Sequence, residues 1–285
     1  MKGLGTALVT PFTKDGNIDY PALGKLIEYQ IAGGIDYLVL LGTTSEVPTL
    51  THEEQNAIIE YAVKQVAGRI PLILGIGGNS THSVVNRINE LKDVLIAHFS
   101  GILSVTPYYN RPQQEGLYLH FCEVAKASPV PVILYNVPKR TGVNMLPETT
   151  RRIYDANPSK IMGIKEACNS VEQFIETANI ANGDYAVISG DDDLAYEMMK
   201  AGGAGLISVA SNAWPKEMKQ IVTEKDAMMQ SKMGHRIHLL FVEGNPSGIK
   251  TVLSEMGLIE NVLRLPMVPC TANTQMVIRR ALSAD

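Results

Sequence analysis

Short apolar runs that resemble buried β-strands alternate with helical patterns along most of this 285-residue chain. Each run is rich in Val and Ile and almost continuous in apolar residues, which is typical of parallel strands covered on both faces. The runs are “TALVT” from Thr6, “YLVLLG” from Tyr37, “PLILGIG” from Pro71, “GILSVTP” from Gly101, “PVILYNV” from Pro131, “IMGIKEA” from Ile161, “YAVISGD” from Tyr185 and “GLISVAS” from Gly205. Eight such units predict an α/β fold, a (β/α)8 TIM barrel, with a doubly wound open sheet as the alternative.

The clearest helical pattern between the runs is “THEEQNAIIEYAVKQVA”. Thr51 is the expected N-cap, and Glu54 completes a capping box. The apolar positions repeat at helical spacing, so we expect one buried face made of Ile58, Ile59, Ala62 and Val66.

Strand-like runs stop after about Ala227, where “MGHRIHLLFVE” and “SGIKTVLSEMGL” are typical of helices. We therefore expect a catalytic barrel over residues 1–226 and a small helical domain over residues 227–285.

Composition excludes several other classes of protein. The net charge of −4 argues against a nucleic-acid partner. No apolar run is long enough to span a membrane, so we expect no membrane partner. The cysteines Cys122, Cys168 and Cys270 are odd in number and far apart, which favours a reduced, cytoplasmic setting.

Polar residues gather where the predicted strands end. They are “GTTSE” after the second run, “TPYYN” after the fourth, “YNVPKRTG” in and after the fifth, Lys165 in the sixth and “SGDDD” after the seventh. In a TIM barrel the chemistry takes place at the carboxyl ends of the strands, so these residues are expected to share one rim.

Lys165 interrupts an otherwise apolar run. It can be structural, paired with a carboxylate such as Glu166 or Asp191. A buried amine is also a candidate nucleophile, because burial disfavours its charged form and a neutral amine attacks carbonyl carbons to form Schiff bases. Glu166 is expected on the opposite face of the strand, as a packing or pairing partner.

Each other polar residue of the rim has a structural and a functional interpretation. Tyr135 can be a core aromatic or a proton shuttle. Tyr109 adjoins Tyr108, so on a strand end the two rings should face opposite sides. Thr43 and Thr44 can shape a turn or bind a carboxylate, and Arg140 can be a solvated loop cation or a bidentate carboxylate ligand.

Signals for cofactors and metals are weak. “GIGGNS” does not fit the dinucleotide fingerprint. The aspartates from Asp191 to Asp193 have no nearby histidine, and His235 and His238 lack a supporting carboxylate. We expect no cofactor and no metal.

The motifs “GTTSE”, “TPYYNRP”, “YNVPKRTG” and “GIKEA”, in this order and spacing, resemble those of the dihydrodipicolinate synthases. These belong to the pyruvate-dependent class I aldolase superfamily, which includes N-acetylneuraminate lyase. The resemblance runs from “TALVTPF” to “LRLPMVP” and implies condensation of pyruvate with L-aspartate 4-semialdehyde to 4-hydroxy-tetrahydrodipicolinate, the committed step of lysine biosynthesis through diaminopimelate.

The resemblance also implies catalytic roles. Lys165 is expected to form the imine and then the enamine with pyruvate. Tyr135 is expected to relay protons, with Thr43 and Tyr109 as its partners. Tyr109 would come from a neighbouring subunit, and the family's usual assembly is a homotetramer, a dimer of dimers.

Binding roles follow in the same way. Thr44 matches the contact to the pyruvate carboxylate and Arg140 the residue that holds the semialdehyde carboxylate. Gly190 and Ile207 match main-chain contacts at the site. The intact “KRTG” favours the synthase over the alternative, an N-acetylneuraminate lyase or a 2-keto-3-deoxy sugar acid aldolase. A non-catalytic keto-acid sensor would be expected to lose the lysine or the tyrosine relay.

Two departures from the family pattern carry expectations. Ser45 replaces a usual glycine, and strain or a shifted turn is expected if that position needs a positive φ. Gln55 and Ser83 replace the histidine and glutamate typical of lysine-sensitive members, so we expect weak or absent inhibition by lysine.

Overall fold

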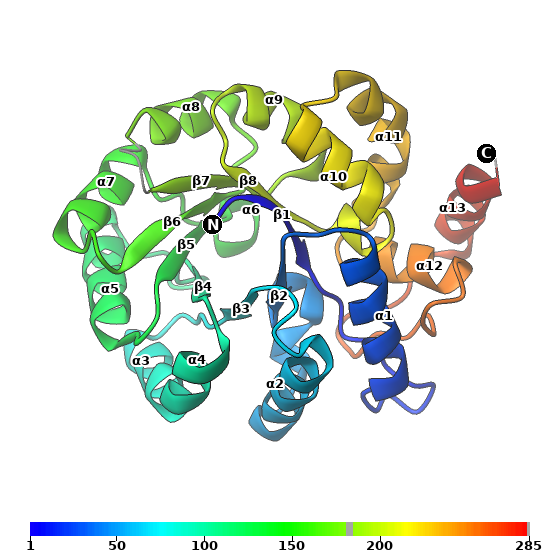
Figure 1. The fold of residues 1–285 in the computed structure, drawn as a ribbon, viewed down its shortest axis with the longest axis horizontal. Helices are drawn as coiled ribbons and strands as arrows, with labels where there is room; N and C mark the ends of the chain where they lie inside the picture. Colours follow the sequence, from blue (N-terminus) through cyan, green and yellow to red (C-terminus); the bar gives the residue numbers. More distant parts are fainter. Residues whose placement is uncertain (181–184, 284–285) are drawn as a thin grey trace. The chain divides into compact units, whose positions relative to one another are not determined.

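The computed structural model describes residues 1–180 and 185–283, and in this part of the chain the strands are the eight predicted ones. They follow one another in sequence order around one closed barrel (Figure 1). The strands are β1 (Gly3–Ala7), β2 (Tyr37–Leu40), β3 (Leu72–Gly75), β4 (Gly101–Val105), β5 (Val132–Asn136), β6 (Ile161–Glu166), β7 (Ala186–Ser189) and β8 (Gly205–Ser208). The predicted (β/α)8 barrel is confirmed, and the open doubly wound sheet is wrong.

Helices occupy the segments between and after the strands. The α-helices are α1 (Tyr20–Ala32), α2 (His52–Val66), α3 (Thr81–Glu90), α4 (Lys92–His98), α5 (Gln114–Ala127), α6 (Pro138–Thr141), α7 (Pro147–Ala156), α8 (Val171–Ile180), α9 (Ala195–Lys200), α10 (Pro215–Glu224), α11 (Ala227–Leu239), α12 (Ser247–Glu255) and α13 (Ala272–Ser283). Short 3₁₀ turns are η1 (Thr43–Ser45), η2 (Val47–Thr49), η3 (Asp192–Leu194) and η4 (Ala210–Asn212). None of the helices in the described residues has the length and apolar character that spanning a membrane requires.

The chain divides into two compact units, which are described separately. The middle unit comprises residues 1–3 and 71–207, and the terminal unit comprises residues 4–70 and 208–285. The region after residue 227 holds α11, α12 and α13. The predicted boundary between residues 226 and 227 stays a prediction.

In the middle unit, strands β3 to β8 pair in parallel with their neighbours. Val132, Ile133 and Leu134 of β5 are fully buried, as expected for a strand covered on both faces. The β5–β6 register shifts by one residue near the start of the pair, because Val132 pairs with Ile161 whereas Ile133 pairs with Gly163. This irregularity sets which side chains meet at the far end of the two strands.

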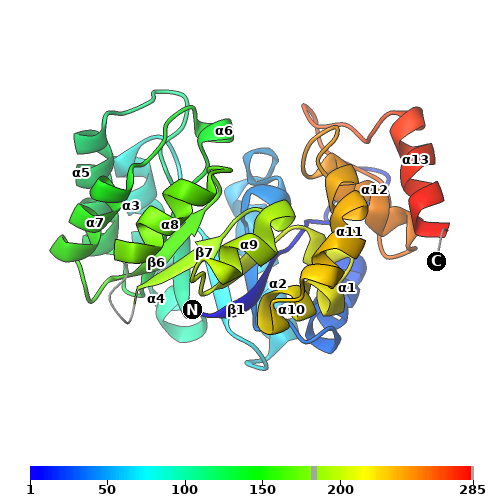
Figure 2. The same ribbon diagram turned by 90° about the horizontal axis from the view of Figure 1, so that it is seen from above.

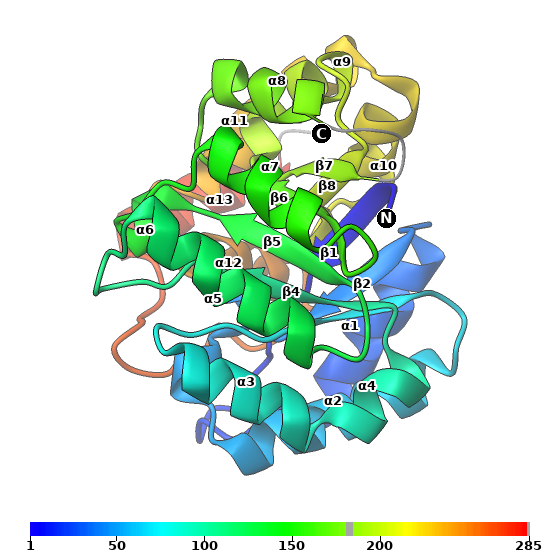
Figure 3. The same ribbon diagram turned by 90° about the vertical axis from the view of Figure 1, so that its left-hand side faces the viewer.

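The helices of the middle unit lie along the outer side of these strands. Figure 3 shows α3, α5 and α7 side by side, and the contacts continue from α7 to α8 and from α8 to α9. Their apolar faces carry fully buried residues such as Ile88, Phe121, Ile153 and Phe174. Burial of this apolar area is the main favourable contribution to the folding of such a layer.

In the terminal unit, α2 begins as predicted from its sequence. The Thr51 side chain accepts a hydrogen bond from the Glu54 N–H over 3.2 Å, and the Thr51 N–H donates to the Glu54 carboxylate over 3.0 Å. The predicted capping box is therefore confirmed. The buried face of the helix is also as predicted: Ile58, Ile59, Ala62 and Val66.

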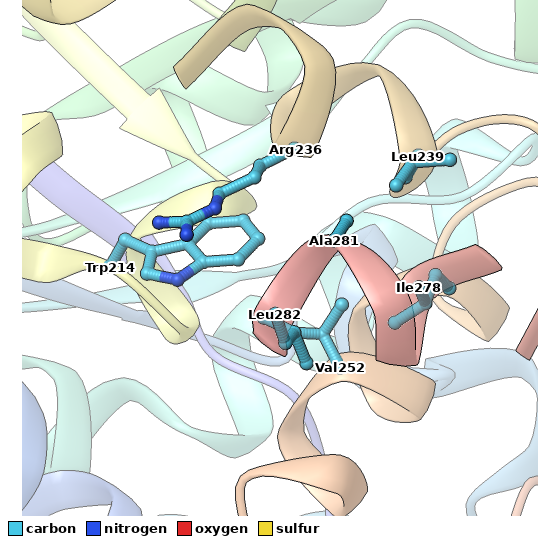
Figure 4. Close-up of a pocket in the computed structure, with 7 residues that line it drawn as sticks. All are labelled: Trp214, Arg236, Leu239, Val252, Ile278, Ala281 and Leu282. Carbon is cyan, nitrogen blue, oxygen red and sulfur yellow. The ribbon is translucent and has the colours of Figure 1, made fainter. Parts of the chain in front are cut away.

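The helices after β8 pack against one another within the terminal unit. α10 contacts α11, and α13 contacts both α11 and α12 (Figure 2). A small apolar hollow lies among them, with the Arg236 guanidinium next to the Trp214 ring, 5.9 Å from its centroid (Figure 4). The hollow is lined by Trp214, Arg236, Leu239, Val252, Ile278, Ala281 and Leu282.

Candidate active site

The lysine predicted as nucleophile lies near the end of β6 and is only 5% exposed. Across the sheet its partner is Tyr135 of β5, so the two side chains share one face. Lys165 Nζ lies 4.4 Å from the centroid of the Tyr135 ring. The structure therefore brings together the predicted nucleophile and the predicted proton shuttle.

Gly190 follows β7 and contacts the Lys165 side chain closely. Its N–H donates to the Glu166 carbonyl oxygen over 2.7 Å. A Cβ atom at this position would lie 2.9 Å from Lys165 Cε and 2.7 Å from the Ala167 Cβ. A larger residue at this position would therefore have to displace the Lys165 side chain and the Ala167 side chain.

Ile207 is fully buried on β8. It lies one residue beyond Leu206, which pairs with Ser189 of β7. Ile207 is therefore on the strand next to the one that Gly190 follows. Its predicted role as a main-chain contact stays a prediction.

Asp191 is a charged neighbour of Lys165 that sequence reasoning considered only as a structural pair or a weak metal signal. Burial raises the pKa of the Asp191 carboxyl, while the Asn169 N–H and the charges of Lys165 and Lys139 oppose that rise. The Asn169 N–H donates to Asp191 Oδ2 over 3.2 Å. The useful sequence signal was the position of Asp191 at the end of the seventh predicted run.

Asn169 links Asp191 to the segment after β5. With its amide oriented to satisfy both neighbours, Asn169 donates to Asp191 Oδ1 over 3.0 Å and accepts from Lys139 Nζ over 2.7 Å. Lys139 belongs to α6, the short helix that also carries Arg140. Three loops that follow β5, β6 and β7 are therefore joined by hydrogen bonds.

Glu166 has partners on the opposite face of β6 from Lys165, as predicted from strand alternation. Its carboxyl accepts hydrogen bonds from Asn136 Nδ2 over 2.8 Å and from Gln173 Nε2 over 3.3 Å. Burial raises the pKa of Glu166 to about 7, although hydrogen bonds from Cys168, Asn136 and Gln173 favour the ionised form. The Glu166 carboxyl thus links β6 to Asn136 at the end of β5 and to Gln173 on α8.

The two adjacent tyrosines lie outside the strand that precedes them. β4 ends at Val105, so the premise that Tyr108 and Tyr109 lie on a strand end was wrong, and strand alternation does not determine where they point. Both rings are exposed, and Tyr109 is 89% exposed with φ of 73°. Arg140 is also exposed, on α6.

Thr43 and Thr44 belong to the terminal unit, on η1. Thr44 is buried, and its Oγ1 accepts a hydrogen bond from Asn245 Nδ2 over 3.0 Å. Thr43 is half-buried. Their predicted roles toward substrate stay predictions.

Ser45 does not have a positive φ, so the condition under which strain or a shifted turn was expected does not hold at this residue. The left-handed backbone occurs one residue later, at Glu46, with φ of 55°. The Ser45 hydroxyl donates to the Leu8 carbonyl oxygen over 2.6 Å, and the Ser45 carbonyl accepts from the Thr10 hydroxyl over 2.9 Å. The serine side chain is thus a buried, satisfied part of the turn.

Comparison with known proteins identifies the family. The model of the Dihydrodipicolinate synthetase family matches residues 1–285. The chain belongs to this family. A curated relative, the 4-hydroxy-tetrahydrodipicolinate synthase of Parabacteroides distasonis, is 46% identical over 289 residues, covering 99% of this chain and 96% of the relative. That of Flavobacterium psychrophilum is also 46% identical, over 93% of this chain and 92% of the relative.

Solved structures of the same family have the same fold. Dihydrodipicolinate synthase from Thermotoga maritima matches with a TM-score of 0.95 at 39% identity, covering 99% of this chain and 98% of that one. The enzyme from Acinetobacter baumannii, solved in complex with pyruvate, matches with a TM-score of 0.94 at 39% identity over 99% and 98%. A monomeric variant of a dihydrodipicolinate synthase also matches, with a TM-score of 0.95. The predicted family and fold are confirmed, whereas the roles of single site residues stay predictions.

Proposed function

We propose that this chain is a 4-hydroxy-tetrahydrodipicolinate synthase, which condenses pyruvate with L-aspartate 4-semialdehyde through an imine on Lys165. The observation that carries the proposal is the buried lysine paired across β5 and β6 with Tyr135, its Nζ 4.4 Å from the ring centroid. Membership of the family, and curated relatives of that name at 40–46% identity, favour this activity over a sugar-acid aldolase.

The reaction begins at the Lys165 amine. Its lone pair attacks the keto carbon of pyruvate, a C–N bond forms, and water leaves to give the iminium. Loss of a methyl proton gives the enamine, whose carbon attacks the aldehyde of the semialdehyde. The semialdehyde amino group then displaces Lys165 from the imine carbon, which closes the ring and regenerates the free lysine amine.

Tyr135 is the proposed proton carrier for these steps. Water can leave the carbinolamine only if its hydroxyl receives a proton, and the methyl proton must then be removed. The ring of Tyr135 lies beside Lys165, which supports this role. Thr43 and Tyr109 are its proposed relay partners, by resemblance to the family motifs.

Two anion sites are proposed for the two carboxylates. Thr44 would bind the pyruvate carboxylate through hydroxyl and main-chain N–H groups, and Arg140 would hold the semialdehyde carboxylate through its fork of N–H donors. Gly190 and Ile207 would contribute main-chain contacts. The exposed position of Arg140 on α6 suits a residue that meets substrate at the entrance.

Assembly is proposed to complete the site. The Tyr109 ring is 89% exposed in the single chain, which supports its donation to a neighbouring subunit. We propose a homotetramer built as a dimer of dimers, acting in the cytoplasm. The three cysteines are free, in agreement with a reducing setting.

Borohydride trapping tests the function. Incubation with pyruvate and borohydride should leave a reduced adduct on Lys165, located by peptide mass spectrometry. Lys165→Ala should give no adduct and almost no turnover, whereas Lys160→Ala, which changes a lysine just before the same strand, should behave as the parent protein. Trapping on any other lysine would contradict the mechanism. Supplying aspartate semialdehyde, or a sialic acid in the cleavage direction, then decides between synthase and lyase.

A further inference from the structure

The terminal unit contains a second buried lysine, which the proposed reaction does not use. Lys250 of α12 is 0% exposed. Its Nζ lies 2.5 Å from Oε1 of Glu46, whose side chain is 1% exposed. Glu46 is the last residue of the “GTTSE” motif and has a left-handed backbone, with φ of 55° and ψ of 35°. A fully buried ion pair thus lies next to the turn that carries Thr43 and Thr44.

The surroundings of the pair provide further contacts to both side chains. Lys250 Nζ donates to the Val262 carbonyl oxygen over 3.0 Å and lies 4.1 Å from the centroid of the Phe12 ring. Glu46 Oε2 accepts from the Arg264 N–H over 3.1 Å. Burial lowers the pKa of Lys250 to about 8, and the Glu46 carboxylate opposes a further fall. Removal of either partner would leave the other charge buried and uncompensated, which is strongly unfavourable.

The turn is held at a second point by the segment just before this helix. Asn245, two residues before α12, donates to Thr44 Oγ1 over 3.0 Å. Lys250, in the middle of α12, holds Glu46. A left-handed backbone at a residue other than glycine persists only where its surroundings determine it, and such residues cluster at functional sites. The two contacts from the α12 segment are constraints of this kind.

Lys250 is excluded as a second Schiff-base nucleophile by its environment. Its side chain has no exposed surface, and its nitrogen already contacts a carboxylate and a carbonyl oxygen and faces an aromatic ring. A keto acid therefore has no access to this amine.

We propose that Lys250 is a positioning residue whose ion pair with Glu46 fixes the turn formed by Thr43, Thr44 and Ser45 in the conformation that pyruvate binding requires. The inference rests on the proposed function, in which Thr44 binds the pyruvate carboxylate and Thr43 takes part in the proton relay. It adds that residues of the C-terminal helical segment determine pyruvate use without contacting substrate.

The test uses two variants and two independent measurements. Lys250→Met breaks the pair, and Lys250→Met/Glu46→Gln removes both charges, so that no uncompensated charge remains if the single variant folds poorly. Hydrogen exchange of the peptide spanning residues 42–50 reports the turn directly. Steady-state kinetics report kcat/KM for pyruvate and, separately, KM for the semialdehyde. Arg279→Met is the matched control, because it breaks the exposed pair of Arg279 with Glu255 on the same α12.

We expect faster exchange of residues 42–50 in the double variant and a loss in kcat/KM for pyruvate of about tenfold or more, as misplacement of a positioning group produces. KM for the semialdehyde should stay near the parent value, and Arg279→Met should change neither measurement. Unchanged exchange in the double variant would overturn the proposal whatever the kinetics. Faster exchange with unchanged pyruvate kinetics would show that the pair fixes the turn but would overturn the claim that pyruvate use depends on it, which is the catalytic link. Failure of the parent protein to trap pyruvate on Lys165 would instead reject the proposed function, and the catalytic link with it.

Discussion

The buried carboxyl of Glu166 makes the stability of the fold depend on pH in a defined direction. Burial raises its pKa from 4.5 to about 7. The folded state therefore binds this proton more tightly than the unfolded state does. The resulting stabilisation is fully present below about pH 4.5 and is lost as the pH rises through about 7.

The magnitude follows from the size of the shift. Each unit of pKa difference corresponds to about 1.4 kcal/mol, so the rise from 4.5 to about 7 corresponds to about 3 kcal/mol. Glu166→Gln keeps the shape of the side chain but cannot titrate. The free energy of unfolding of the parent protein, minus that of the variant, should fall by about 3 kcal/mol between pH 4 and pH 8.

The assay is urea unfolding of both proteins at several pH values across this range, followed by circular dichroism and tryptophan fluorescence. Glu172→Gln serves as the control, because it removes an exposed carboxylate on the neighbouring helix α8. The free energy of unfolding of the parent protein minus that of Glu172→Gln should stay nearly constant with pH. A difference for Glu166→Gln that is equally constant, or that grows with pH, would refute the assignment of Glu166 as the buried acid.

Three further outcomes are expected. Arg140→Ala should raise KM for the semialdehyde while borohydride trapping of pyruvate survives. The control is Arg151→Ala, a half-exposed arginine on α7. Equal loss of trapping in Arg140→Ala would contradict the role of Arg140. Gly190→Ala should slow imine formation at least tenfold, because its Cβ would lie 2.9 Å from Lys165 Cε, and normal trapping would show that the side chain can move aside. Lysine should inhibit weakly or not at all, since Ser83 offers no charge to an ammonium group; strong sub-millimolar inhibition in a lysine titration would contradict this.

Much of the fold was predictable because its signals are local. The strand-like runs and the Thr51 capping box each depend on residues close together in the chain. Sequential strand order in a barrel then places β5 beside β6. Family membership and fold were confirmed by the comparisons as well, since the motifs that carry the resemblance are also short local segments.

The exact meeting of Tyr135 with Lys165 was not predictable from the two strands alone. If the pairing of Val132 with Ile161 continued without a shift, Tyr135 would lie opposite Ile164. The irregularity after Val132 moves the register by one residue, so that Lys165 takes this place. A single extra residue at the start of a strand pair, which no periodic pattern reveals, thus decides which side chain lies opposite Tyr135.

The contacts that Asn169 and Lys250 make with charged residues were missed for a related reason. Asp191 and Lys139 approach Asn169 from different loops, and Glu46 meets Lys250 across most of the chain. One sequence contains no signal that pairs residues so far apart. A buried lysine on an amphipathic helix also looks like any solvated cation until its surroundings are known.

The contacts between the C-terminal helical segment and the “GTTSE” turn have a consequence for synthesis on the ribosome. The partners Asn245 and Arg264 follow Thr44 and Glu46 by 201 and 218 residues. At a translation rate of about 5–20 residues per second, these partners are synthesised on the order of 10–40 s after the turn. During this interval Glu46 lacks the partners that hold its left-handed backbone, and its carboxylate remains in water. Translation of the final quarter of the chain therefore sets the earliest moment at which a nascent molecule can acquire the proposed activity.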